Sequence, residues 1–320
     1  MPTRLLFFSI SVLAGLCISC EQNARRQEVF EAQEITAIDS LATSAQVRQF
    51  VRKWGSNCYR FIVTDSLYQD CVDRQTCLTP DNRRSWVKAD FDNDGSTDLL
   101  VTGRDSEHFV RDRSIICFLN KRQQSPRIIW LAEDGDDCPV AQVGYLRNKA
   151  IIRYAHVSLS KLRGAQTTSS RQSVCRIDTL VFKEPGFIEY SRAPKDYQIQ
   201  RVAFSTEACY GSCPIFELHV ARNGAATYRA EEYNERKGTF TATVDAQAIK
   251  ELWDLLNYLN FPQLEEKYAV RATDHPTCTL TITYADGKVK TIEDYGEQGT
   301  FGLQRAYELL FALRNSQAWK

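Results

Sequence analysis

The sequence has no surplus of either charge. Lysine and arginine together number 40, aspartate and glutamate also number 40, and the formal net charge at pH 7 is zero. Proteins that bind nucleic acid through its phosphates carry a basic surplus or a basic stripe. The basic clusters here are dipeptides, Arg25-Arg26 and Arg83-Arg84, which we interpret as solvated surface. Nucleic acid is therefore not an expected partner.

The sequence also lacks the local motifs that identify common classes of enzyme. It contains no Gly-x-Ser-x-Gly elbow, no His-Glu-x-x-His zinc pair, no Walker loop and no dinucleotide-binding fingerprint. Histidine is scarce, with four residues in the whole chain. The sequence thus favours a protein that is not an enzyme. The alternative is a hydrolytic or thiol-redox enzyme whose site is assembled from residues distant in sequence.

The apolar run at the start of the chain, residues 5–16, is too short to span a membrane, because a spanning helix needs roughly 20 apolar residues. It follows Arg4 and precedes small residues and a cysteine, an order typical of an export signal. We expect cleavage after Ser19 and lipid on Cys20, because Cys17 follows a bulky leucine. Several acyl chains, palmitate among them, would give stable anchoring where one chain does not. The alternative is an ordinary secretory signal with an incidental cysteine.

These features predict the layout of an exported lipoprotein. Residues 1–19 are the signal peptide, and residues 20–38, rich in Glu, Gln, Asn and Arg, are a lipidated tether. Residues 39–194 and 195–320 are two folded domains, in keeping with the length of the chain. The protein is then attached to a membrane of the cell envelope through its lipid, with the outer membrane favoured.

The number of cysteines fits an exported protein. Apart from Cys17 and Cys20, nine of the 11 cysteines remain. An exported chain meets oxidants, so several of the nine should be paired. Because nine is odd, at least one is unpaired or bonded elsewhere, and spacing alone does not give the connectivity.

The first domain is predicted to be rich in β-structure after one leading helix. The helix is indicated by apolar residues at helical spacing, Val47, Phe50, Val51 and Trp54. Ser44 is the expected N-cap and Gly55 the expected stop. Short apolar runs then predict strands at residues 59–64, 99–102, 115–119, 128–131, 150–154 and 179–182. Turn signals separate them, at Asp94-Gly95, Asp134-Gly135 and Pro185-Gly186.

The second domain is predicted as strands, helix, hairpin and helix, which makes the whole chain α+β. Asn223-Gly224 indicates a hairpin with a type I′ turn, since both central positions of that turn need positive φ. Asp245 is positioned to cap a helix with its apolar stripe on one face. Asp286-Gly287 marks a second hairpin, and a last apolar stripe predicts the final helix.

The sharpest motif in the first domain is an acidic loop reading Asp-Phe-Asp-Asn-Asp-Gly-Ser-Thr-Asp. Alternate oxygen-bearing residues around a glycine turn suit a hard cation such as calcium. The predicted ligands are the carboxylates of Asp90, Asp92, Asp94 and Asp98 and the carbonyl of Ser96. The alternative is a turn that holds itself by hydrogen bonds from backbone to side chains.

This acidic loop is not an EF-hand, because position 12, where an EF-hand carries glutamate, is Val101 and a strand follows. It resembles the calcium loops of FG-GAP and integrin-type repeats, which imply a strand, an Asp-rich loop and a second strand. One good copy is present, so a propeller is not expected.

The second domain opens with Cys209-Tyr-Gly-Ser-Cys213-Pro-Ile-Phe216. This pattern, Cys-x-Gly-x-Cys-Pro-x-aromatic, resembles a bacterial family of exported lipoproteins with a domain of unknown function. Further matching marks are Asn223-Gly224, Tyr228, Gly238, Phe261, Tyr268, Asp274, Pro276 and Gly287. The resemblance covers about residues 201–313 and implies a fold unit and an exported context, with no reaction attached.

Cys209 and Cys213 are close enough along the chain to form a local disulfide, which is our prediction. A redox-active pair is one alternative, although thioredoxin-like pairs lie at a helix start and a strand is expected here. A zinc site built with His275 and Cys278 is another, disfavoured in oxidising surroundings.

Taken together, the sequence predicts a lipid-anchored envelope protein of binding or structural type, with calcium as the cofactor of the acidic loop. Its expected partners are the membrane, through the anchor, and a protein or other envelope ligand that the sequence does not identify.

Overall fold

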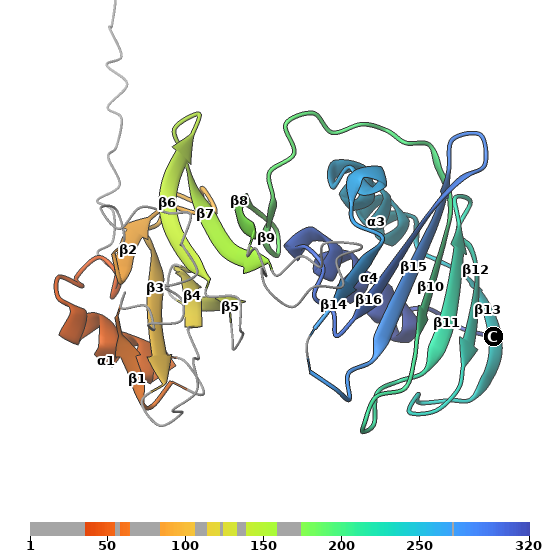
Figure 1. Ribbon diagram of the computed structural model, residues 1–320, viewed down its shortest axis with the longest axis horizontal. Helices are drawn as coiled ribbons and strands as arrows, with labels where there is room; N and C mark the ends of the chain where they lie inside the picture. Colours follow the sequence, from red (N-terminus) through yellow and green to blue (C-terminus); the bar gives the residue numbers. More distant parts are fainter. Residues whose placement is uncertain are drawn as a thin grey trace, which may run out of the picture. The chain divides into compact units, whose positions relative to one another are not determined.

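The computed structural model describes residues 36–54, 58–64, 84–105, 114–121, 124–132, 139–158, 174–270 and 272–320 (Figure 1). The predicted lipid site Cys20, the helix stop at Gly55 and the turn at Asp134-Gly135 lie outside these residues. In the part of the chain that is described, no helix is both long enough and apolar enough to cross a membrane.

The first sheet has five strands, four of them in the order β1-β3-β4-β5, and β2 pairs with β3. Its strands are β1 (Phe61–Val63), β2 (Trp86–Ala89), β3 (Asp98–Asp105), β4 (Ser114–Leu119) and β5 (Arg127–Ala132). Helix α1 (Ser44–Trp54) packs its buried residues against one face of β3 and β4, where Leu99, Val101 and Phe118 lie.

The second sheet has four antiparallel strands in sequence order, β6 (Val140–Leu146), β7 (Lys149–Ser158), β8 (Val174–Lys183) and β9 (Gly186–Glu189). Its Ile152, Leu180 and Phe187 share a buried cluster with Ile115 and Cys117 of β4. Strand β4 is therefore covered on both faces, which explains its continuous apolar run where a half-exposed strand would alternate.

The third sheet has seven strands in the order β13-β12-β11-β10-β15-β16-β14. They are β10 (Ile199–Thr206), β11 (Phe216–Ala221), β12 (Ala225–Ala230), β13 (Gly238–Thr243), β14 (Lys267–Ala269), β15 (Thr277–Tyr284) and β16 (Lys288–Tyr295). Only β14 pairs in parallel, with β16. Strands β10 and β15 are neighbours at the centre but are separated in sequence by residues 207–276, so this sheet depends on contacts between distant residues.

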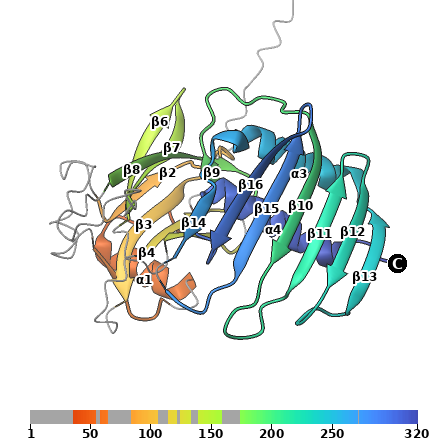
Figure 2. The same ribbon diagram turned by 45° about the vertical axis from the view of Figure 1, so that its right-hand side comes forward.

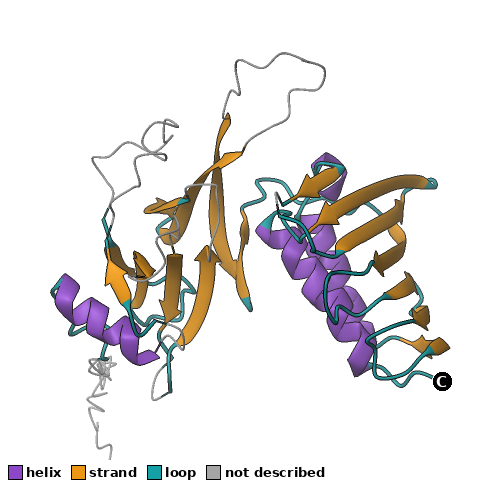
Figure 3. Ribbon diagram, turned by 60° about the horizontal axis from the view of Figure 1, so that its bottom comes forward, coloured by secondary structure: helices purple, strands orange, loops and turns teal. Residues whose placement is uncertain are grey.

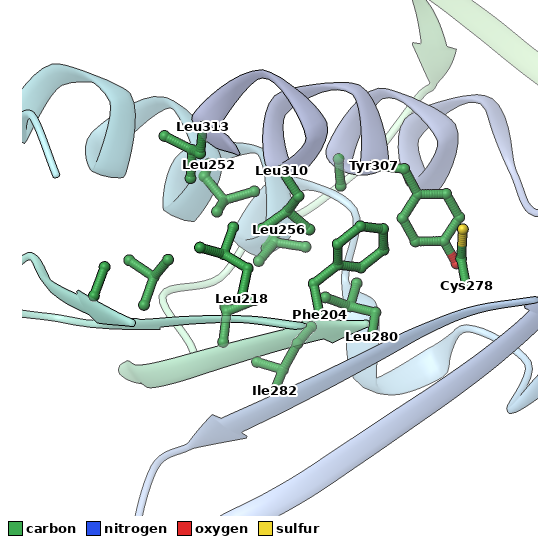
Figure 4. Close-up of a cluster of buried hydrophobic side chains, with 14 of the residues drawn as sticks. Phe204, Leu218, Leu252, Leu256, Cys278, Leu280, Ile282, Tyr307, Leu310 and Leu313 are labelled. Atoms are coloured by element: carbon green, nitrogen blue, oxygen red, sulfur yellow. The ribbon is translucent and has the colours of Figure 1, made fainter. Parts of the chain in front are cut away.

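Helices α3 (Ala246–Tyr258) and α4 (Phe301–Ser316) lie on one face of the third sheet, and the short helix η2 (Phe261–Gln263) follows α3 (Figure 3). Alternate strand residues such as Phe204, Leu218 and Leu280 point at the helices, where Leu256 and Leu310 meet them (Figure 4). The opposite strand residues, which include Thr279, Thr281 and Thr291, face away from the helices. This division follows from the period of two in a strand.

The elements agree with the α+β prediction, but two local details were wrong. The N-cap of α1 is Thr43, one residue before the predicted Ser44. The Thr43 Oγ1 atom accepts from Gln46 N at 3.3 Å, and Gln46 Oε1 accepts from Thr43 N at 3.0 Å. This reciprocal capping box satisfies two backbone donors, which a serine next to it does not do.

The second correction concerns the hairpin turns. Asn223-Gly224 does join β11 and β12, but positive φ occurs at Gly224 (87°) and not at Asn223, so the turn is not type I′. The β6–β7 hairpin instead has positive φ at both Arg147 (50°) and Asn148 (64°), with Leu146 paired to Lys149. A loop of three residues at 222–224 accounts for the first difference.

Strand β9 contacts helix α4 of the third sheet's layer. The Glu189 carboxylate accepts from Phe301 N at 2.7 Å and from Gly302 N at 3.0 Å, the first two amides of α4. Burial raises the pKa of the Glu189 carboxyl, although these two hydrogen bonds act to lower it. Residues 36–320 form one compact unit, and the domain boundary predicted at 194 falls in the segment between β9 and β10.

The outer edge of the third sheet, β13, is covered by residues 319 and 320. Lys320 N donates to Thr241 O and Thr241 N donates to Lys320 O, both at 3.0 Å. Trp319 is buried, with its ring 5.2 Å from the ring of Tyr228. The pairing satisfies backbone groups that an open edge would leave to solvent.

Candidate functional site

The acidic loop connects β2 to β3, with Ala89 and Asp98 paired at its base. Its sharp course needs left-handed backbone at Asn93 (φ 61°) and Gly95 (φ 83°), and glycine adopts this at no steric cost. Backbone amides donate to the carboxylates of the loop itself. Gly95 N reaches Asp90 Oδ2 at 3.1 Å, and Ser96 N reaches Asp94 Oδ1 at 2.8 Å.

Three of the predicted ligands are brought together. One carboxylate oxygen from each of Asp90, Asp92 and Asp98 lies within 4.8 Å of the others, close enough to hold one metal ion. The Asp94 carboxylate is outside this group, because one of its oxygens accepts from Ser96 N and the other faces Lys121. Ser96 itself is buried.

Asp98 is the innermost of these residues and is fully buried. Its two oxygens accept from Phe91 N at 2.7 Å and from Asn120 N at 2.8 Å. Burial raises the pKa of Asp98 to about 7, and the negative charge of Asp92 raises it as well. The two backbone hydrogen bonds act in the opposite direction. The Asp90 Oδ1 atom is out of reach of solvent and has no hydrogen-bond partner in the described part of the chain.

Lys121 provides positive charge at the loop, and the sequence did not identify it. Its Nζ lies 2.6 Å from Asp92 Oδ2 and 3.6 Å from Asp94 Oδ2. The hydrogen bond to Asp92 raises the pKa of Lys121. Lys121 follows β4, and the pairing of β4 with β3 carries it to the loop. Without that pairing, nothing in the sequence distinguishes it from other lysines.

The predicted disulfide between Cys209 and Cys213 is present, with a Cα–Cα distance of 5.8 Å. The loop that it closes precedes β11, so no helix start is available to activate a thiol. The disulfide also occupies two of the four ligands in the zinc alternative. Cys278, a third, is a buried thiol that points into the core beside Tyr307 (Figure 4).

A second buried carboxylate, Asp294, lies at the end of β16 and was not singled out from the sequence. Its oxygens accept from Gln298 N at 2.7 Å and from Gly299 N at 2.9 Å, which folds the chain back just before α4. A Cβ at Gly299 would lie 2.8 Å from Asp294 Oδ2, so this position has no room for a side chain.

Two further polar groups lie near Asp294. The Cys278 thiol contacts Glu297 Oε1 at 3.8 Å. Burial raises the pKa of both Asp294 and Glu297, and the charge of Asp294 raises that of Glu297 further. Asp294 and Cys278 are fully buried and Glu297 is half-buried, and we assign these groups to positioning the start of α4.

One surface cavity lies beside helices α3 and α4. It has a volume of about 590 Å³ and lies among the β8–β9 turn, residues 194–196 and helices α3 and α4. Its Arg305 is paired with Glu251 at 3.0 Å, and the Lys183 ammonium lies 4.3 Å from the centre of the Tyr258 ring. Burial raises the pKa of Tyr258. The described lining contains no serine, threonine, cysteine or histidine, the side chains most often used as nucleophile or as its general base.

Comparison with known proteins covers the C-terminal half of the chain. Neither a curated protein nor a solved structure matches the chain. The resemblance of the acidic loop to FG-GAP repeats stays a prediction. The predicted resemblance to a domain of unknown function is confirmed, because residues 200–314, from β10 into α4, match DUF6438, a domain of unknown function; the lipoprotein part of that prediction stays a prediction.

Proposed function

We propose that this chain is a lipid-anchored protein of the cell envelope that acts by binding, and that its acidic loop holds a calcium ion. The proposed anchor, Cys20, rests on the signal-like order of residues 1–20. The disulfide at Cys209–Cys213 fits an exported protein, because such bonds persist in oxidising compartments. We favour binding over the enzyme alternative because the described lining of the cavity beside α3 and α4 contains no serine, threonine, cysteine or histidine.

The observation that carries the calcium proposal is the convergence of the Asp90, Asp92 and Asp98 carboxylates. Like charges at this separation repel each other, and the repulsion is strongest where one partner is buried, as Asp98 is. A divalent ion turns this repulsion into attraction. Asp90 Oδ1, which has no other partner in the described region, gains one in the ion. Calcium accepts about 6–8 oxygen ligands at flexible distances, which suits a loop rich in carboxylates and carbonyls.

Lys121 supports a second candidate, in which the loop needs no metal. Its ammonium already neutralises Asp92 and approaches Asp94. Calcium that uses the same Asp92 oxygen must displace this ammonium. Lys121 is therefore either a competitor of the ion or its substitute, and one experiment separates the two.

The experiment measures calcium binding by calorimetry and melting temperature in EDTA-treated full-length protein. Calcium at a hundred times its dissociation constant should stabilise the fold by about 2.7 kcal/mol. Asp90→Asn and Asp92→Asn should abolish the response. Asp286→Asn, in the exposed Asp-Gly turn between β15 and β16, is the matched control and should keep it.

Lys121→Gln sharpens this test. If Lys121 competes with calcium, its removal should tighten calcium binding about fivefold or more, the effect of roughly 1 kcal/mol from a partly exposed charge. If Lys121 is the substitute, parent and Lys121→Gln will both fail to bind calcium at millimolar concentration. That result would reject the calcium proposal.

The anchor has its own test. Cys20→Ser cannot form the thioether, so it should incorporate no radioactive palmitate and should leave the detergent phase. Cys17→Ser is the matched control and should label like the parent. Labelling of Cys20→Ser at the parent level would show that the lipid is elsewhere.

A further inference from the structure

Two exposed tyrosines lie on adjoining loops at one end of the third sheet. Tyr210 is 87% exposed and Tyr233 is 58% exposed. Single exposed aromatic residues are ordinary, but these two loops are bonded together: Ile215 N donates to Glu232 O and Glu231 N donates to Ile215 O, both at 2.9 Å. Both loops lie at the lower end of the sheet (Figures 1 and 2).

The backbone at each tyrosine is fixed. Tyr210 lies inside the disulfide loop, and its N–H donates to Asp274 O at 3.1 Å. Tyr233 precedes Asn234, whose Nδ2 donates to Ile215 O at 2.7 Å. The Oδ1 atom of Asn234 accepts from the Tyr228 hydroxyl at 2.9 Å. Rings presented on fixed backbone lose little freedom on binding, which is a property of good contact residues.

The charge around the two tyrosines is mainly negative. Five carboxylates and two basic side chains occur in the described residues of these loops: Glu207, Glu231, Glu232, Glu235, Asp274, Arg236 and Lys237. Lys237 is paired with Glu232, Arg229 of β12 lies 3.6 Å from Glu231, and the Arg236 guanidinium stacks 4.3 Å from the centre of the Phe240 ring. These basic side chains are thus engaged within the protein, and Glu207, Glu235 and Asp274 have no ion pair with a described basic residue. The surface complements positive charge and repels polyanions.

We propose that this loop end, defined as residues 207–215, 231–237 and 272–276, binds a protein segment that presents arginine or lysine. Tyr210 and Tyr233 offer ring faces for cation–π contacts, and the carboxylates supply the attraction that brings a cation to them. The disulfide keeps Tyr210 presented when nothing is bound. This site is separate from the acidic loop, so it stands or falls independently of calcium.

The test uses oxidised full-length protein and a fluorescein-labelled dodecapeptide of alternating arginine and glycine, followed by fluorescence anisotropy. Tyr210→Ala and Tyr233→Ala should each weaken binding about fivefold, the value of roughly 1 kcal/mol for one cation–π contact. Tyr145→Ala is the matched control, because Tyr145 is 70% exposed but lies on β6. It should bind like the parent.

A second variant separates presentation from the ring itself. Cys209→Ser with Cys213→Ser retains Tyr210 but opens its loop, and it should also weaken binding at least twofold. Melting curves of the tyrosine variants should match the parent, since both rings are exposed. The proposal is overturned if the peptide does not bind, if the three tyrosine variants bind alike, or if a glutamate–glycine peptide binds equally well.

Discussion

Asp98 and Asp294 make an informative comparison, because each is fully buried and each accepts hydrogen bonds from two backbone amides. Their surroundings differ. Asp98 has two more carboxylates converging on it and a lysine at the rim of the loop. Asp294 lies among a phenol, a thiol and one glutamate, with the loop before α4 folded over it.

The difference shows that a buried carboxylate can serve two purposes. The Asp294 carboxylate oxygens hold the loop before α4, whose backbone amides donate to them. At Asp98 the same kind of backbone donors is present, but two neighbouring carboxylates add a repulsion that the Lys121 ammonium or, as we propose, a calcium ion offsets. A buried acid alone is therefore a structural feature, and convergence with other acids is what indicates an ion site.

The largest expected effect comes from removing either acceptor. Asp98→Ala and Asp294→Ala each leave two backbone donors without their acceptor, at about 1–3 kcal/mol for each buried donor. We expect each to lose about 2–5 kcal/mol in free energy of unfolding, measured by urea denaturation with and without calcium. Asp254→Ala, an exposed site on α3, should change stability by less than about 0.5 kcal/mol.

The same pair of variants tests whether the two buried carboxylates differ in their link to calcium. Asp294→Ala should keep the calcium response of the parent, whereas Asp98→Ala should lose it. Equal responses in the two variants would mean that the converging acids do not distinguish the two sites.

A smaller effect is expected at the disulfide loop, which is closed by a covalent bond and not by hydrogen bonds to a buried carboxylate. Closing a loop of this length is worth about 2 kcal/mol in a chain-entropy model. Cys209→Ser with Cys213→Ser should lose about that much, equally with calcium and with chelator, in urea denaturation. The matched measurement is reduction of the disulfide in the parent protein. Cys117→Ser is not a suitable control, because Cys117 is buried in the core. A loss that depends on calcium would couple the two loops.

The smallest effect is the pH dependence that Glu297 contributes. Its pKa is raised in the folded protein by burial and by the charge of Asp294. Its contribution to stability is therefore complete below the unfolded pKa of about 4.3 and is lost as pH rises through the folded pKa. Glu297→Gln should therefore lose less stability than the parent as the pH rises above about 4.3, measured by urea denaturation across this range.

The matched control for that measurement is Glu293→Gln, an exposed residue on β16, the strand that ends just before Glu297. It should follow the pH profile of the parent. Identical profiles for the parent and Glu297→Gln would show that Glu297 does not respond to the burial described here.

Much of the fold could be predicted from sequence because strand and helix periods are local. Examples are the apolar residues at helical spacing that predicted α3 and α4, and the hairpin at Asn223-Gly224. The acidic loop and the cysteine pair were visible for the same reason. Lys121 and Asp294 were not, because their partners come from strand pairing or from a loop that folds back. Glu189 is the clearest case, since the amides that it caps are more than a hundred residues away.

The pairing of Lys320 with Thr241 has a consequence for how this protein avoids self-association. An uncovered β13 would present a row of unpaired donors and acceptors, which is the template that foreign strands use in edge-to-edge aggregation. The lipid anchor that we propose would hold neighbouring copies at high local concentration, where such an edge is more hazardous than in dilute solution. Lys320 thus blocks this edge at Thr241, and the Trp319 indole holds the segment in place by donating to Leu313 O and Arg314 O.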